Sequence, residues 1–209
     1  HIQSDYVDEQ GLAQLMQRSA AITTEFENVP AAALVTLEAH RPVAPGAQAV
    51  AICQDRALEK AHFRRCGVPC APHAVIETAE QLAAVDAALL PGILKTARLG
   101  YDGKGQVTVK TPEDLAAAWA QLGRVPCVLE QRLDLAFEVS VIVARNAQGE
   151  VVHFPVQRNL HRDGILAVTT VPAPEVGPEL QAQAVGAAEC LAASMHYVGV
   201  LCVEFFVLR

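Results

Sequence analysis

Gly100-Tyr101-Asp102-Gly103-Lys104-Gly105-Gln106 is the stretch of sequence that decides the fold, because it places three glycines within seven residues. The residues before it (92–96, Gly-Ile-Leu-Lys-Thr) and after it (106–110, Gln-Val-Thr-Val-Lys) are both strand-like. The glycines are therefore predicted to lie at the tip of a hairpin, and not between a strand and a helix.

The hairpin setting limits which phosphate-binding motif this stretch can be. Dinucleotide fingerprints and Walker-type loops both open a helix, whose N-terminus holds the phosphates. A flexible glycine hairpin can instead cover a nucleotide and offer backbone N–H groups to its phosphates, as the glycine-rich loop of kinases does. We therefore predict a nucleotide site beneath the hairpin.

Composition narrows the class of protein. The chain has 209 residues, of which 52% are apolar, so it can bury a sizeable core. A formal net charge of −7 argues against a general nucleic-acid or anionic-membrane surface. Of the six cysteines only Cys66 and Cys70 are close in sequence, and no second pair completes a zinc site. We expect reduced thiols in a cytoplasmic protein with neither a nucleic-acid nor a membrane partner.

The first part of the chain predicts a helix over 8–18, a buried strand over 21–26 and a helix over 31–39. A strand followed by a helix is typical of an open α/β sheet, in which ligands bind at the carboxyl ends of strands. Glu25 and Glu27 lie at such an end and, being two apart, point the same way. They either face a ligand or are solvated acids at a strand exit.

The middle of the chain predicts a charged helix and then a β-α-β-β-α-β unit around the glycine hairpin. On the charged helix, like charges four residues apart indicate either external partners or a solvated face. These pairs are Asp55 with Glu59 and Arg56 with Lys60. The further predicted elements are helices at 54–66, 78–90 and 112–122 and strands at 73–76 and 125–131, with Thr78 as an N-cap.

The last third predicts an antiparallel sheet and one long helix, so the fold class is a mixture of α/β and α+β. The turn Asn146-Ala147-Gln148-Gly149 joins the first two strands, and a polar loop at 158–164 precedes the third. The predicted strands are 137–145, 150–157, 165–171 and 198–207, and the helix is 178–195.

Lys95 and Glu204 are charged residues within apolar strands, where a charge without a partner is costly. Lys95 lies five residues before the glycine stretch, so it either meets a nucleotide phosphate or snorkels to water from an edge strand. Glu204 meets either an arginine in a structural ion pair or Mg²⁺, which uses one or two carboxylates together with substrate phosphates.

Two further sets of polar residues are candidates for nucleotide contacts. Glu130 and Glu138 flank a short excursion between two strands, which could present backbone groups to a base and a carboxylate to ribose. Asn159 and His161 lie in the predicted polar loop, where His161 either contacts a phosphate or caps the loop.

Together these motifs resemble one family. Residues 91–96, the glycine stretch and residues 159–166 (Asn-Leu-His-Arg-Asp-Gly-Ile-Leu) resemble the N5-carboxyaminoimidazole ribonucleotide synthetases, which are ATP-grasp enzymes of purine biosynthesis. This family is also called the ATPase subunit of phosphoribosylaminoimidazole carboxylase. The resemblance runs nearly end to end, since four shorter pieces also fit: 24–28, Asp55-Arg56, Lys60 and 197–201.

The resemblance implies a ligase that uses Mg²⁺ with ATP. Such an enzyme converts ATP, bicarbonate and 5-aminoimidazole ribonucleotide to N5-carboxyaminoimidazole ribonucleotide, ADP and phosphate. Bicarbonate would attack the γ-phosphoryl group to give carboxyphosphate, and this intermediate, or CO₂ released from it, would react with the exocyclic amine. Catalysis would rest on positioning and charge neutralisation. The resemblance also implies a homodimer.

The resemblance implies roles for individual residues. Lys95, Asp102 and Lys104 would be catalytic, Tyr101 and Asp102 would reach the ribonucleotide, and Glu204 would be one of two metal-binding glutamates. The implied ATP site places phosphates near Arg56 and the glycine stretch, adenine along 130–133 and ribose at Glu138. Its residues are Arg56, Lys95, Gly100, Tyr101, Asp102, Gly103, Lys104, Gly105, Gln106, Glu130, Gln131, Arg132, Leu133, Glu138 and His161.

The implied fold is the ATP-grasp fold, with a small β-α-β-β-α-β lid and a larger antiparallel sheet with helices. The expected divisions are the remnant of an open α/β domain (1–45), a linker helix (46–72), the lid (73–134) and the large subdomain (135–209). The family's glycine-rich strand-to-helix turn and its second metal glutamate do not occur in this sequence. We therefore expect a fragment of a larger enzyme.

Two other functions share several of these features. A related purine-pathway ATP-grasp ligase or formate-dependent transformylase would share the lysine, the glycine stretch and the metal acid. It should lack the combination of residues 101–106 with residues 159–166. A non-catalytic nucleotide-binding module is the third possibility.

Overall fold

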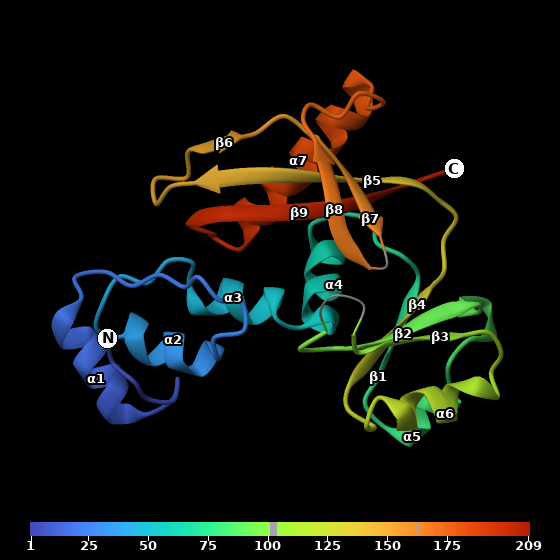
Figure 1. The fold of residues 1–209 in the computed structure, drawn as a ribbon, viewed down its shortest axis with the longest axis horizontal. Coiled ribbons are helices and arrows are strands. Elements are labelled where there is room, and N and C mark those ends of the chain that lie inside the picture. Colours follow the sequence, from blue (N-terminus) through green and yellow to red (C-terminus); the bar gives the residue numbers. More distant parts are fainter. Residues whose placement is uncertain (101–103, 163) are drawn as a thin grey trace.

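The computed structural model of the chain describes residues 1–100, 104–162 and 164–209. Three groups of elements surround helix α4 (Arg56–Arg65), as Figure 1 shows. A group of helices lies on one side of α4, a small sheet lies on the other side, and a larger sheet lies along both. In the described part of the chain no helix is long and apolar enough to cross a bilayer.

The first group contains the helices α1 (Glu9–Arg18), α2 (Ala31–Glu38) and α3 (Ala47–Cys53). They pack around a small apolar core formed by Val29, Leu34, Leu37, Ala47 and Val50. The sequence did not predict α3, because its seven residues, AQAVAIC, are nearly all apolar and show no helical alternation of polar and apolar faces.

The predicted strand over 21–26 is wrong. Ile22 makes a single parallel bridge with Val43, and the rest of the segment forms no ladder. A strand needs a continuous partner for its backbone groups, and here only one pair is made. Glu25 and Glu27 are both exposed on this irregular segment.

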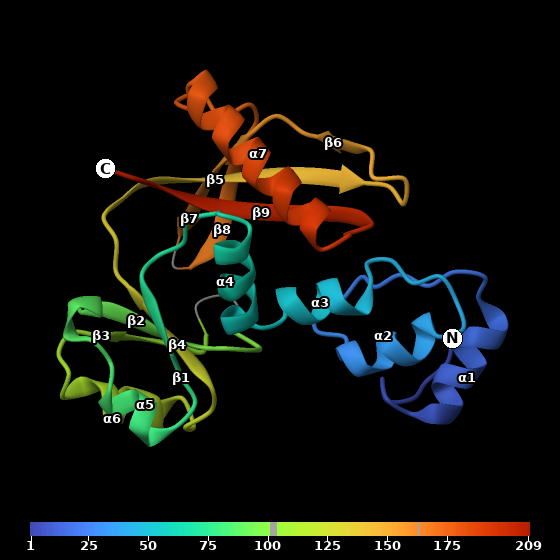
Figure 2. The same cartoon turned by 180° about the vertical axis from the view of Figure 1, so that it is seen from behind.

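The small sheet confirms the predicted β-α-β-β-α-β unit. Its strands follow the order β1-β4-β2-β3 and every neighbouring pair is antiparallel. The helices α5 and α6 cover one face (Figures 1 and 2), with Ile76, Leu94, Trp119 and Leu129 in the core between them. The elements are β1 (His73–Ile76), α5 (Ala79–Ala83), the 3₁₀ helix η1 (Ala87–Leu89), β2 (Gly92–Thr96), β3 (Gln106–Val109), α6 (Asp114–Gln121) and β4 (Cys127–Gln131).

Thr78 caps α5 as predicted. Its hydroxyl accepts a hydrogen bond from the Gln81 backbone N–H at 3.3 Å, while the Gln81 side chain accepts from the Thr78 N–H at 3.2 Å. This reciprocal arrangement is a capping box. The predicted helix over 78–90 is nevertheless shorter than expected, because α5 ends at Ala83 and only a 3₁₀ turn follows.

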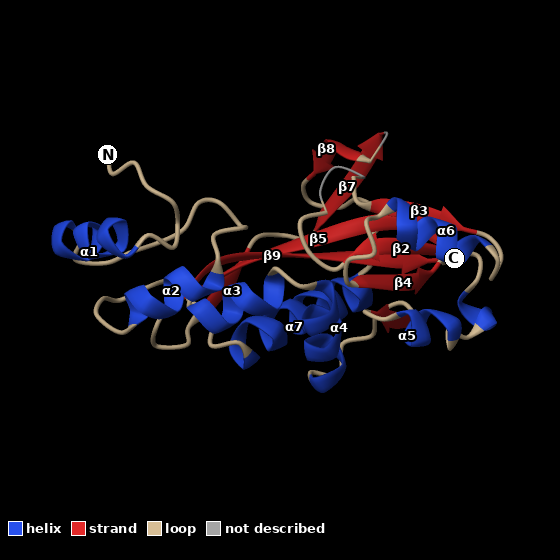
Figure 3. Cartoon of the chain, turned by 90° about the horizontal axis from the view of Figure 1, so that it is seen from below, coloured by secondary structure: helices blue, strands red, loops and turns tan. Residues whose placement is uncertain are grey.

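The larger sheet is antiparallel, with strand order β6-β5-β7-β8 and with β9 on the other side of β5. Helix α7 covers one face, where Ala188 and Leu191 meet Val139 and Val141 in the core (Figure 2). In Figure 3 the helices α2, α3, α4 and α7 lie on one side of β5 and β9, and the β7–β8 hairpin rises on the other. The elements are β5 (Leu135–Arg145), β6 (Val151–His153), β7 (Gln157–Arg162), β8 (Ile165–Thr170), α7 (Pro178–Ser194) and β9 (Gly199–Leu208).

The predicted polar loop over 158–164 is wrong for residues 158–162, which belong to β7, while residue 163 lies outside the described residues. The strand is polar because the face that carries Gln157, Asn159 and His161 pairs with polar groups of β5 and β8 and not with an apolar core. Asn159 is buried on that face and accepts a hydrogen bond from the Thr169 hydroxyl of β8 at 3.1 Å. The expected division at residues 45, 72 and 134 stays a prediction.

Candidate functional site

A cleft of about 1580 Å³ opens between the three groups of elements. It is lined by residues of the β2–β3 hairpin and of helix α4, by Glu138 of β5 and His161 of β7, and by β9. Many of the residues that the sequence singled out line it together: Arg56, Lys95, Gly100, Gln106, Glu130, Leu133, Glu138, His161 and Glu204.

Some of the predicted site residues are placed elsewhere. Of the described residues, Lys104, Gly105, Gln131 and Arg132 are not part of the cleft lining, and the Gln131 side chain donates to the Ala88 carbonyl at 3.1 Å. Tyr101, Asp102 and Gly103 lie outside the described residues, so the roles expected for them remain predictions.

The first turn of α4 is attached directly to the end of β2. Asp55 caps the helix by accepting hydrogen bonds from two backbone N–H groups, at 3.0 and 3.2 Å. The backbone N–H of Arg56 donates to the Ala97 carbonyl at 2.9 Å, and the Arg98 guanidinium pairs with Asp55 at 3.0 Å. A Cβ on Gly100 would lie only 3.8 Å from Arg56 Nη2. Arg56 therefore lies at the base of the glycine hairpin, where the phosphates were predicted.

The base of the hairpin explains one of its glycines. Gly105 has a φ of +71°, and a Cβ there would approach Thr96 Oγ1 to 2.7 Å. The Gly105 carbonyl also accepts a hydrogen bond from the Thr96 N–H at 2.8 Å. Because Lys95 pairs with Gln106 in the β2–β3 ladder, the predicted hairpin is confirmed at its base.

Lys95 has a protein partner that the sequence did not indicate. Its Nζ lies 2.7 Å from Glu130 Oε2, and Lys60 Nζ lies 2.9 Å from Glu130 Oε1. Burial alone would raise the pKa of Glu130, but the charges and hydrogen bonds of Lys95 and Lys60 hold it below its usual value. Glu130 is therefore an ionised carboxylate held between two ammonium groups.

Glu59 is a further charged group of α4 that lines the cleft. Burial raises the pKa of its carboxyl, although the neighbouring Arg56 and Lys60 act in the opposite direction. Sequence reasoning assigned no role to Glu59 and gave none to Lys60 beyond the family match. The like charges four residues apart on this helix were the signal, since they indicate partners outside it.

Three side chains from neighbouring strands converge on the opposite wall of the cleft. Glu138 of β5, His161 of β7 and Glu204 of β9 each offer a ligand atom, and these atoms lie within 4.8 Å of one another. His161 Nδ1 is 3.3 Å from Glu138 Oε2. Burial and the Glu204 charge raise the pKa of Glu138, while His161 and a hydrogen bond with Asn159 act against them. Strand pairing therefore builds an acidic cluster from residues that are distant in sequence.

Contrary to the expectation from sequence, Glu204 is not buried among apolar side chains. It is exposed, because β9 alternates: Val203 and Phe205 face the core beneath α7, while Glu204 faces the cleft. None of the ion pairs among the described residues involves Glu204, which removes the support for a structural arginine partner.

The donor atoms of this cluster suit a hard cation. Mg²⁺ is usually bound by one or two carboxylates together with substrate phosphates. Glu138 and Glu204 offer carboxylate oxygens at a cleft whose other wall carries Arg56 and Lys95. The residues present therefore fit Mg²⁺ that arrives with a nucleotide, whereas the His161 imidazole is better suited to a hydrogen bond.

The strands that carry Glu138 and His161 also hold polar residues that sequence reasoning missed. Ser140 of β5 donates a hydrogen bond to Gln157 Oε1 of β7 at 3.2 Å, and both side chains are buried. Gln157, Asn159 and His161 are spaced two apart, which is the spacing of one strand face. This alternation was the available signal, and the assignment of a loop concealed it.

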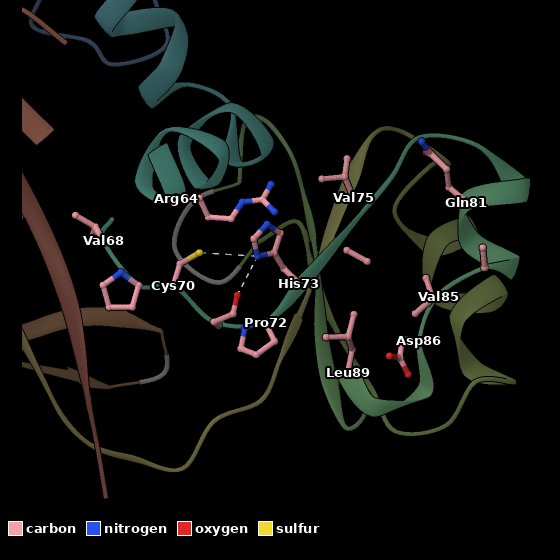
Figure 4. Close-up of a pocket in the computed structure, with 14 residues that line it drawn as sticks. Arg64, Val68, Cys70, Pro72, His73, Val75, Gln81, Val85, Asp86 and Leu89 are labelled. Carbon is pink, nitrogen blue, oxygen red and sulfur yellow. Dashed lines mark hydrogen bonds between the residues drawn. The ribbon is translucent and has the colours of Figure 1, made fainter. Parts of the chain in front are cut away.

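A second hollow of about 730 Å³ lies beside β1 and contains none of the predicted site residues. Figure 4 shows His73 with Cys70 and Arg64 on one wall and Val85 and Leu89 on the other. The His73 imidazole is already engaged, with Nδ1 2.9 Å from the Ala71 carbonyl. The geometry places no reactive constellation here.

Comparison with known proteins supports the fold. The profile of the "ATP-grasp domain" family matches residues 61–209, and that of the "Ribonucleotide synthetase preATP-grasp domain" family matches residues 1–54. The chain therefore belongs to the ATP-grasp family, and a preATP-grasp segment precedes its ATP-grasp domain. The predicted ATP-grasp fold is confirmed.

Several relatives of the chain share one name. The chain is 40% identical over 207 residues to the N5-carboxyaminoimidazole ribonucleotide synthase of Pseudomonas aeruginosa, covering 99% of this chain and 57% of that protein. The crystal structure of the corresponding synthetase from Thermus thermophilus superposes with a TM-score of 0.89 at 36% identity, covering 99% and 56% of the two chains. The predicted resemblance to these synthetases is confirmed.

A third relative carries ligands. The N5-carboxyaminoimidazole synthase of Aspergillus clavatus, solved in complex with ADP and 5-aminoimidazole ribonucleotide, matches with a TM-score of 0.87 at 26% identity. It is matched over 100% of this chain and 55% of its own. The chain thus spans little more than half the length of the relatives that it matches.

Proposed function

We propose that the protein catalyses the ATP-dependent carboxylation of 5-aminoimidazole ribonucleotide with bicarbonate. The products are N5-carboxyaminoimidazole ribonucleotide, ADP and phosphate. The observation that carries this proposal is one cleft with Arg56 and Lys95 below a glycine hairpin on one wall and Glu138 and Glu204 on the other. The shared name of the relatives, which match 98–99% of this chain, supports N5-carboxyaminoimidazole ribonucleotide as the product.

The proposed nucleotide position follows the cleft. Arg56, Lys95 and backbone N–H groups of the hairpin neutralise the phosphates, and His161 lies near them. The adenine lies along 130–133, and Glu138 accepts hydrogen bonds from the ribose hydroxyls. Leu133 and Glu130 both line the cleft, which supports this orientation.

The chemistry proposed for the cleft is phosphoryl transfer to bicarbonate. Bicarbonate attacks the γ-phosphorus to give carboxyphosphate and ADP. Carboxyphosphate, or CO₂ released from it, is then captured by the exocyclic amine of the ribonucleotide. The chain's contribution is to hold the reactants in line and to neutralise the charge that develops on the phosphoryl oxygens.

Further assignments rest on the resemblance. We propose that Glu204 holds Mg²⁺, which supplies positive charge at the phosphates when bound. Lys104 and Asp102 act in catalysis beside Lys95, and Tyr101 and Asp102 contact the ribonucleotide. The protein is also proposed to be a cytoplasmic homodimer.

The proposal is tested with the full-length protein. ADP release is measured with Mg²⁺ and ATP, with and without 5-aminoimidazole ribonucleotide and bicarbonate. We expect ADP release to rise when both substrates are added. Rapid ATP hydrolysis at a rate that does not change when the ribonucleotide is added would indicate another ATP-grasp ligase. Nucleotide binding without hydrolysis would indicate a binding module.

A further inference from the structure

Lys60 is a buried charge that the proposed mechanism leaves without a task. Only 7% of it is exposed, and its ammonium lies 2.9 Å from one oxygen of Glu130. The second oxygen of the same carboxylate is 2.7 Å from Lys95, the residue proposed to bind phosphate. Lys60 and Lys95 therefore share a single counter-ion.

This sharing matters when Lys95 engages a phosphate. A buried carboxylate that loses its only partner is strongly destabilised. If Glu130 were paired with Lys95 alone, the Lys95 ammonium could therefore not leave it for a phosphate without a large cost in free energy. With Lys60 in place, Glu130 keeps one ammonium when the other turns away.

The backbone around Lys60 fixes its position. It lies four residues after Arg56 and so on the same face of α4. The first turn of this helix is joined to the end of β2 through the Arg56 N–H and the Ala97 carbonyl, at 2.9 Å. Lys60 therefore approaches Glu130 from a different element than Lys95 does, and it can remain there when the Lys95 side chain moves.

We propose that Lys60 is a positioning residue that acts through Glu130 on Lys95. It remains the counter-ion of Glu130 and thereby releases the Lys95 ammonium to the nucleotide phosphates. This inference rests on the proposed binding of ATP in the cleft, but it does not depend on which second substrate the enzyme carboxylates.

The test is a double-mutant cycle on the full-length protein, read as the affinity for MgADP by calorimetric titration. We expect Lys60→Met to weaken MgADP binding about tenfold, as is typical for coupled groups. Lys60→Arg should retain most of the affinity, because it restores the charge.

In a Glu130→Gln background, where Lys95 has no carboxylate to leave, Lys60→Met should cause almost no further loss of MgADP affinity. Lys110→Met, at an exposed lysine beyond β3, is the matched control and should bind as the wild type does.

Thermal unfolding of each variant without nucleotide separates this role from a purely structural one. A Lys60→Met protein that unfolds earlier but binds MgADP as tightly as the wild type overturns the inference. So does an equal loss of affinity with and without Glu130, because Lys60 would then act on the nucleotide directly. Failure of the wild type to bind MgADP overturns both this inference and the proposed function. Normal MgADP results combined with turnover that ignores the ribonucleotide overturn the proposed function alone.

Discussion

Lys95 and Glu204 line the same cleft from different sheets and show how a side chain's surroundings set its task. Lys95 is largely buried and already paired with Glu130, whereas Glu204 is exposed with no ion pair among the described residues. Removing Lys95 disturbs a buried charge network, while removing the Glu204 charge takes away a ligand atom and a like charge near Glu138. Substitutions at the two positions should therefore affect stability differently, even though both should stop turnover.

Glu204→Gln isolates the binding role. We expect the free energy of unfolding to change by less than about 0.5 kcal/mol, as for other surface positions. The turnover of the full-length protein should fall at least about 100-fold, because stabilisation of the transferring phosphoryl group is lost. Glu179→Gln, at an exposed position at the start of α7 outside the cleft, is the control. Full activity in Glu204→Gln would refute the metal assignment.

The pH dependence of stability tests the paired carboxylate. Because the pKa of Glu130 is lowered in the fold, its contribution is complete above the ordinary carboxyl pKa and is lost as the pH falls through the lowered value. Glu130→Gln should be less stable than the wild type by about 3 kcal/mol at pH 7, since two buried lysines lose their partner. The difference should shrink as the pH is lowered toward 3, in denaturant titrations at each pH. A constant difference over this range would contradict the assignment.

Among the elements, the glycine hairpin depends on backbone geometry as much as on sequence. Gly105 and Gly123 both have positive φ, at +71° and +81°. A Cβ would meet Thr96 Oγ1 at 2.7 Å in the first case and has open space in the second. Alanine at either position should cost about 1 kcal/mol from the left-handed backbone alone. Gly105→Ala should cost more because of the added contact, and it should also weaken MgADP binding. Equal losses of stability in the two variants would show that the approach to Thr96 is not restrictive.

The local sequence pattern was sufficient to predict elements in which apolar residues face the core and polar residues face solvent. The β-α-β-β-α-β unit and the cap at Thr78 follow from periodicity and turn residues, and both are confirmed. The errors occurred where a strand or helix departs from these patterns. In residues 157–162, alternate side chains pair with polar groups of β5 and β8. Residues 47–53 are nearly all apolar, and Ile22 makes one bridge where a ladder was expected.

For the whole molecule, the site is assembled from segments that are far apart in the chain. Lys60 and Glu130 belong to different elements, and Glu138, His161 and Glu204 come from three strands. Sequence motifs could identify most of the charged residues that line the cleft, because each is a charge in an unusual setting. They could not identify the contacts, since a carboxylate shared by two lysines requires the packing of α4 against the small sheet.

The central claim, that this cleft transfers the γ-phosphoryl group to bicarbonate for carboxylation of a ribonucleotide, has a direct isotopic test. Full-length protein is incubated with ATP, Mg²⁺, 5-aminoimidazole ribonucleotide and ¹⁸O-labelled bicarbonate, and the released phosphate is analysed by mass spectrometry. In carboxyphosphate the bridging oxygen comes from bicarbonate and stays with phosphorus when the carboxyl group leaves. We therefore expect one ¹⁸O in the phosphate, formed at a rate that depends on the ribonucleotide. Phosphate without ¹⁸O, released alongside ADP in the presence of all substrates, would contradict the account.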